Sequence, residues 1–82
     1  MPELTQAKKE AIFEELLAES ERLFNAFKEK MEMEPPDYDE VEFFRMETTV
    51  EDAALAAKEA GNQAEYDRLK QKHLAIMRWR FG

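Results

Sequence analysis

The sequence contains no cysteine, only two glycines and three prolines, and no long hydrophobic run among its 82 residues. Without cysteine the chain cannot form a disulfide framework, a thiolate metal site or a cysteine nucleophile. No stretch approaches the roughly 18 apolar residues of a membrane span, and the charged first residues lack the apolar core of a signal peptide. These absences predict a cytoplasmic protein with no membrane partner.

Charge is abundant and unevenly distributed. The 19 acidic residues outnumber the 12 basic ones and give a net charge of −7. This balance disfavours nucleic acid as a partner, because a nucleic-acid footprint is normally a basic face on a basic domain. Residues 61–82 nevertheless carry five basic and two acidic residues. We therefore expect this C-terminal segment to dock beside the acidic segment 29–42, in the same chain or in a second copy.

Glycine and proline divide the chain into helix-forming segments. They occur at Pro2, Pro35, Pro36, Gly61 and Gly82. The segments between them are rich in Ala, Glu, Lys, Leu and Met, which favour helix. The predicted fold is a single all-α domain over residues 1–82, with helices at about 5–32, 38–60 and 62–80 and an acidic linker at 33–37. Asp37 and Glu40 have capping-box spacing, and Thr49 followed by acidic residues leaves open a break near 48–49.

The first helix carries an apolar stripe. Its members are Phe13, Leu16, Leu17, Ser20, Leu23, Phe24, Phe27 and Met31, which span about 120° of the helix. A helix of about 27 residues is about 40 Å long, whereas a compact globule of this length is about 30 Å across. We therefore predict that a second copy covers the overhang as a two-fold dimer that completes a helical bundle. The predicted interface residues on this helix are Phe13, Leu17, Phe24, Phe27 and Met31.

The second and third segments predict an αα-hairpin on which the long first helix packs. Gly61 is a natural left-handed stop, and Asn62 is placed to cap the next helix with Glu65 three residues later. The third helix then has a seam formed by Tyr66, Leu69, His73, Ile76 and Arg80.

The C-terminal sequence interleaves basic and aromatic residues. Arg78, Trp79, Arg80 and Phe81 are of types enriched at protein interfaces, so we include them in the predicted interface. Two alternatives stay open for them: a contact within the chain, and binding to nucleic acid or a lipid surface.

Carboxylates are the only abundant groups from which an enzyme could be built. A Mg²⁺-dependent hydrolase would use the acidic clusters of the first two helices, namely Glu15, Glu19, Glu47, Glu51 and Asp52. Their spacing does not match the motifs of such enzymes, and solvated helix faces account for them. The single histidine, His73, has Lys70 rather than Glu three residues before it, which excludes the Glu-x-x-His metal motif. We expect His73 to be half-buried and bonded to a backbone or carboxylate group.

These observations favour a non-catalytic protein–protein interaction module, such as an adaptor, a co-chaperone-like subunit or a regulator. It would act as a homo-oligomer and need no cofactor and no metal. Two alternatives remain: a Mg²⁺-dependent all-α hydrolase, and an acidic mimic of nucleic acid that inhibits a basic partner.

Overall fold

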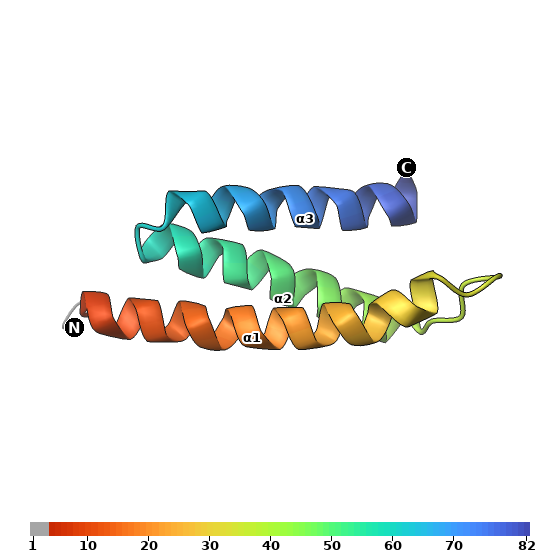
Figure 1. Ribbon diagram of the computed structural model, residues 1–82, viewed down its shortest axis with the longest axis horizontal. Coiled ribbons are helices and arrows are strands. Elements are labelled where there is room, and N and C mark those ends of the chain that lie inside the picture. Colours follow the sequence, from red (N-terminus) through yellow and green to blue (C-terminus); the bar gives the residue numbers. More distant parts are fainter. Residues whose placement is uncertain (1–3) are drawn as a thin grey trace.

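Three antiparallel helices lie along one long axis. The computed structural model of the protein describes residues 4–82, with α1 at Gln6–Met31, α2 at Glu40–Glu59 and α3 at Gln63–Phe81. Helix α1 packs on α2, and α2 packs on α3, so that α2 is the middle helix of the chain (Figure 1). The prediction of an all-α unit with a long helix on a helical hairpin is confirmed.

The molecule is a rod rather than a compact globule. Its principal axes measure 48 × 19 × 18 Å, and its radius of gyration is 14.0 Å. The expected diameter of about 30 Å is therefore wrong for the long axis. The reason is that α2 and α3 run alongside α1 instead of crossing it (Figure 1). The length of α1 alone thus gives no argument for a dimer.

The boundaries of the helices follow their caps. The Thr5 hydroxyl accepts a hydrogen bond from the Lys8 amide at 3.2 Å, and α1 ends at Met31, before the two prolines. Helix α2 begins after Asp39, whose carboxylate accepts from the Val41 amide at 2.7 Å. The predicted cap at Asp37 is wrong by two residues.

Helix α2 also continues through Thr48 and Thr49 without a break. The Thr49 hydroxyl donates to the Arg45 carbonyl at 2.7 Å, one turn earlier, instead of capping a new helix.

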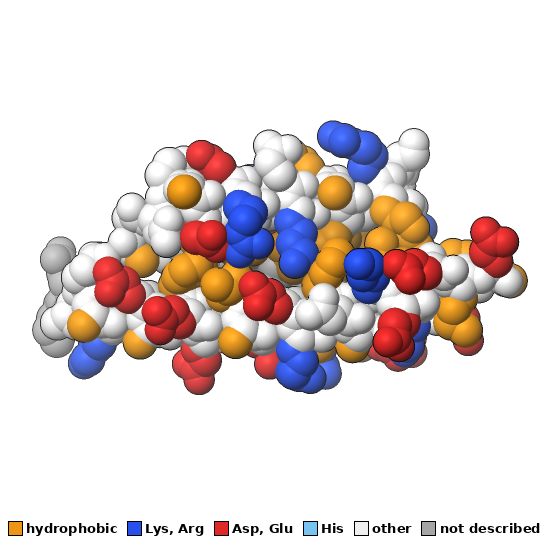
Figure 2. Space-filling view, in the orientation of Figure 1, with side chains coloured by type: hydrophobic (Ala, Val, Ile, Leu, Met, Phe, Trp, Pro, Cys, Tyr) orange, Lys and Arg blue, Asp and Glu red, His pale blue; other side chains and the backbone are white. Residues whose placement is uncertain are grey.

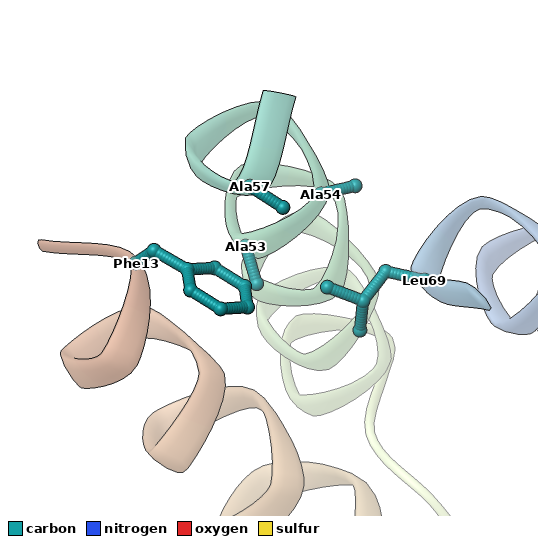
Figure 3. Close-up of a cluster of buried hydrophobic side chains, with 5 residues drawn as sticks. All are labelled: Phe13, Ala53, Ala54, Ala57 and Leu69. Carbon is teal, nitrogen blue, oxygen red and sulfur yellow. The ribbon is translucent and has the colours of Figure 1, made fainter. Parts of the chain in front are cut away.

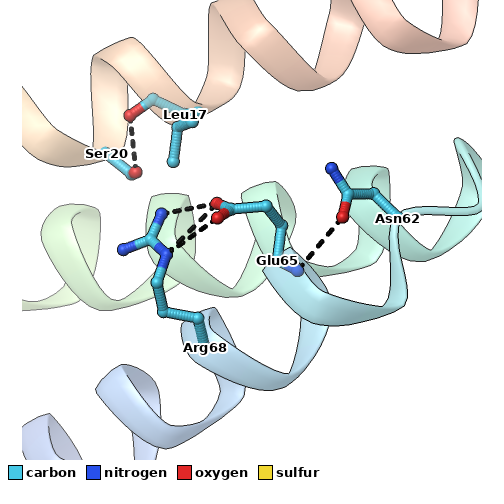
Figure 4. A network of polar contacts seen from close by, with 5 residues as sticks. All are labelled: Leu17, Ser20, Asn62, Glu65 and Arg68. Carbon is cyan, nitrogen blue, oxygen red and sulfur yellow. Dashed lines mark hydrogen bonds and ion pairs between the residues drawn. The ribbon is translucent and has the colours of Figure 1, made fainter.

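The hairpin turn has the predicted form. Gly61 has a φ of 77°, and the amides of Gly61 and Asn62 donate to the carbonyls of Lys58 and Ala57 at 3.0 and 2.8 Å. These two bonds form a Schellman motif, which satisfies carbonyls at the end of α2. Asn62 then caps α3 by accepting a hydrogen bond from the Glu65 amide at 3.2 Å (Figure 4). The turn therefore fixes the register of α3 against α2.

Replacing Gly61 with valine should lower the free energy of unfolding by about 1 kcal/mol or more, because a β-branched residue is penalised at positive φ. No atom lies within 4 Å of a Cβ built at this position, so the cost is one of backbone conformation alone. Gly61→Asn should cost less, because asparagine tolerates this conformation. Asn62→Ala should cost about 1 kcal/mol through loss of the cap. Chemical denaturation of the three variants tests this, and equal costs for Gly61→Val and Gly61→Asn would contradict it.

The core consists of two clusters along α2. The first contains Phe13, Ala53, Ala54, Ala57 and Leu69. Phe13 of α1 and Leu69 of α3 approach the alanines of α2 from opposite sides (Figure 3). Small side chains here allow α2 to pack closely against both neighbours. The second cluster contains Phe27, Phe43, Met46, Val50 and Ile76.

Candidate functional site

An apolar stripe on α2 faces solvent. Val41, Phe44 and Leu55 are 68%, 67% and 51% exposed. At 100° per residue these three side chains and Thr48 fall within about 60° of the helix. They lie on the side of α2 opposite its buried residues, which contact α1 and α3. We call Val41, Phe44, Thr48 and Leu55 the outer stripe.

The last turn of α3 adds a further exposed aromatic residue near this stripe. Arg80 Nη2 lies 2.7 Å from Glu40 Oε1, and the ring of Phe81 lies 6.3 Å from that of Phe43. These contacts hold the end of α3 beside the start of α2. Phe81 therefore lies at the same end of the molecule as Val41 and Phe44, and 68% of its surface is exposed.

The predicted interface residues of α1 pack against other residues of the same chain. Phe13 and Phe27 are buried in the two core clusters, and Leu17, Phe24 and Met31 are half-buried against those clusters. The apolar stripe of α1 is thus covered largely by α2 and α3.

Of the four predicted interface residues at the C-terminus, Trp79, Arg80 and Phe81 contact other parts of the same chain. The Trp79 ring lies 6.1 Å from Phe27 and 5.3 Å from Tyr38, and Arg80 pairs with Glu40. These contacts place the basic end of α3 beside the acidic segment 29–42 of the same chain. Arg78 and Phe81 are exposed, and Trp79 keeps 37% of its surface exposed despite its ring contacts.

Sequence reasoning missed Val41, Phe44 and Leu55. The second helix shows a clear repeat of buried positions, and these three residues fall outside it. Large apolar residues outside the repeat were the available signal, because a helix with a single buried face normally carries polar residues on the opposite side.

A groove between α1 and α2 begins at one end of the outer stripe. It has a volume of about 270 Å³ and is lined by Leu23, Ala26, Phe27, Lys30, Val41, Glu42, Arg45 and Met46. Lys30 and Glu42 form an ion pair across it. Since Val41 belongs to both surfaces, the groove extends the apolar area from α2 toward α1.

The face formed by α1 and α3 is different in character. Figure 2 shows hydrophobic side chains between these helices, with Lys, Arg, Asp and Glu side chains around them. Lys72 Nζ lies 4.1 Å from the centroid of the Phe24 ring, and burial lowers the pKa of this lysine. Arg68 pairs with Glu65 at 2.6 Å, and this hydrogen bond lowers the pKa of Glu65 and raises that of Arg68 (Figure 4). The chain's own charged side chains therefore border this face.

A polar cluster lies on the seam between α2 and α3. His73 Nε2 is 2.6 Å from Glu47 Oε1 and 3.8 Å from Glu51 Oε2. The expectation that His73 is half-buried and bonded to a carboxylate is confirmed. Thr48 Oγ1 donates to Glu47 Oε2 at 3.4 Å.

The five carboxylates considered for a hydrolase do not come together. Glu47 and Glu51 meet at His73, and within residues 4–82 these three form the one group of potential metal ligands whose atoms converge. Glu15 and Glu19 lie on α1, where Glu19 pairs with Arg22, and Asp52 lies outside the cluster. The cluster that does form depends on His73, which sequence reasoning had not grouped with these acids.

Comparison of the chain with protein-family models, with curated proteins and with solved structures finds no match. Across residues 4–82, every helix is too short or too polar to cross a membrane. We therefore infer a function from two features of the described residues, the outer stripe and the polar cluster.

Proposed function

We propose that the protein is a non-catalytic protein–protein interaction module that forms a two-fold homodimer through the outer stripe of α2. The observation that carries this proposal is the exposure of Val41, Phe44 and Leu55 on one face of a helix whose other face is fully packed. Apolar residues aligned in this way are typical of a helix that packs against a partner. The proposed interface thus differs from the α1 stripe, which serves the fold.

The arrangement of residues along the stripe suits a second copy of the same helix. Val41 and Leu55 are equally distant from Thr48, so an antiparallel pair with its axis near Thr48 sets Val41 of each chain opposite Leu55 of the other. Arg45 and Asp52 are seven residues apart and therefore share one flank of the stripe. The same axis sets Arg45 of each chain opposite Asp52 of the other. A two-fold interface would then combine apolar contacts with two pairs of opposite charge.

A dimer of this kind suits an adaptor, a co-chaperone-like subunit or a regulator. In such a dimer the second copy covers the outer stripe. The faces that include α1 remain exposed to solvent in both chains. The net charge of −7 would attract basic partners to the dimer as a whole.

Analytical ultracentrifugation of the Phe44→Glu variant tests the proposed dimer. We expect the unaltered protein to dimerise at micromolar concentrations and Phe44→Glu to be monomeric, because the new charge would be buried without a partner. Ile12→Glu is the matched control, since Ile12 is also exposed but lies on α1. It should dimerise normally. An unaltered protein that stays monomeric at tens of micromolar would overturn the proposal.

A charge exchange tests the geometry of the dimer separately. Arg45→Glu and Asp52→Arg should each weaken association, because each sets like charges opposite one another. The protein with both substitutions should recover most of the loss. If the double variant dimerises no better than the single ones, the two helices do not pair about an axis near Thr48.

A further inference from the structure

The polar cluster on the α2–α3 seam has the composition of a metal site. Glu47 and Glu51 are one turn apart on α2, and His73 faces them from α3. One ligand atom from each residue lies within 4.8 Å of the other two. An imidazole nitrogen with two carboxylate oxygens is a donor set that suits zinc and related first-row ions, whereas Ca²⁺ and Mg²⁺ prefer oxygen ligands alone.

The distances are close to those that an ion requires. Zinc binds nitrogen and oxygen ligands at about 2.0–2.2 Å in tetrahedral sites, which sets the ligand atoms about 3.3 Å apart. His73 Nε2 lies 2.6 Å from one carboxylate oxygen and 3.8 Å from the other, so these two spacings bracket that value. Small rotations of the side chains would equalise them.

The surroundings also suit an ion. The side chains of Glu47 and His73 are 12% and 14% exposed, whereas that of Glu51 is 47% exposed, so one side of the cluster is open to solvent. The Thr48 hydroxyl contacts the second oxygen of Glu47 and helps to orient this carboxylate. The hairpin turn and the packing of Leu69 and Ile76 hold the two helices in register. Ligands on two packed helices are well positioned before an ion arrives.

We propose that Glu47, Glu51 and His73 bind one Zn²⁺ ion per chain. The ion takes the place of the contact between His73 Nε2 and Glu47 Oε1 and joins Glu51 to the same centre. Three protein ligands leave a fourth position, which water fills from the solvent side at Glu51. Each chain carries all three ligands, so the site does not depend on self-association.

Calorimetric titration with zinc chloride in a non-chelating buffer tests the site. We expect one ion per chain and a higher midpoint of thermal unfolding in the presence of zinc. Glu51→Gln should weaken binding about tenfold or more through the loss of a ligand while the fold is kept, because Glu51 is partly exposed. His73→Gln should abolish the one-site binding. Mg²⁺ at the same concentration should not replace zinc.

Glu15→Gln is the matched control, because Glu15 and Glu19 form an acidic pair with the same spacing on α1 but without a histidine. It removes the same charge and should leave zinc binding unchanged. Circular dichroism verifies the fold of each variant. The proposal is overturned if the unaltered chain shows no one-site binding, or if Glu15→Gln weakens binding as much as Glu51→Gln. Unchanged binding by a folded His73→Gln variant also overturns it.

Discussion

Replacing Phe27 with alanine should lower the free energy of unfolding by about 3–5 kcal/mol, which is the cost of removing a large aromatic side chain from a core. Phe27 is only 3% exposed. Its ring lies 5.2 Å from Tyr38 in the linker, 5.9 Å from Phe43 on α2 and 6.1 Å from Trp79 on α3. A single side chain of α1 thus packs near aromatic residues of the segment between α1 and α2, of α2 and of α3. Chemical denaturation followed by circular dichroism measures the loss.

Phe44→Ala provides the comparison for Phe27→Ala. The two phenylalanines differ in burial, since Phe44 is largely exposed on the outer stripe. Measured on the monomeric protein, Phe44→Ala should therefore change the free energy of unfolding by about 0.5 kcal/mol or less. If both variants lose a similar amount of unfolding free energy, the contacts of Phe27 with Tyr38, Phe43 and Trp79 do not stabilise the fold more than an exposed aromatic residue does.

Local sequence signals were sufficient to predict most of the fold. Helix-forming composition, the prolines after α1 and the Gly61–Asn62 pair act over a few residues, and each imposes a boundary that tertiary packing did not change. The start of α2 was predicted two residues too early, because Asp37 and Asp39 are both able to cap a helix and the spacing to Glu40 favoured Asp37. Tyr38, between them, packs against Phe27, a contact made by residues distant in the sequence. Such a contact cannot be read from local spacing.

The surfaces were harder to predict than the helices. Periodicity shows that a face of α1 is apolar, but not whether the same chain or a second copy covers it. The stripe from Phe13 to Met31 suggested an interface, and the structure covers it mainly with α2 and α3. The outer stripe of α2 was overlooked because that helix is apolar on two sides and the buried repeat is the longer of the two.

The contact between His73 and Glu47 could have been inferred from the position of the hairpin turn between α2 and α3. In an antiparallel hairpin, residues at similar distances before and after the turn lie opposite one another. Glu47 is fourteen residues before Gly61, and His73 is twelve residues after it. Once the turn is assigned to Gly61, the spacing of acids on α2 can be matched to the single histidine on α3. This inference combines two local features of the sequence, namely the turn at Gly61 and the spacing of acidic residues on α2.

His73→Leu should lower the free energy of unfolding by about 3 kcal/mol, whereas His73→Leu combined with Glu47→Leu should cost much less. The single substitution leaves the carboxylate of Glu47 on the seam without its imidazole partner, and its remaining contact, with the Thr48 hydroxyl, is long at 3.4 Å. An uncompensated buried charge is expensive. Removing both groups leaves an apolar seam that leucine side chains can fill beside Val50 and Ile76.

A double-mutant cycle measured with a metal chelator present tests this coupling without any contribution from zinc. Glu47→Leu alone should cost less than His73→Leu, because an unpaired imidazole on the seam can remain neutral, whereas a carboxylate must take up a proton to do so. The coupling energy should therefore be large and of the sign that makes the double variant more stable than the sum of the two changes predicts. If the two costs simply add, Glu47 and His73 do not interact in solution, and the close contact between their side chains contributes nothing to the stability of the hairpin.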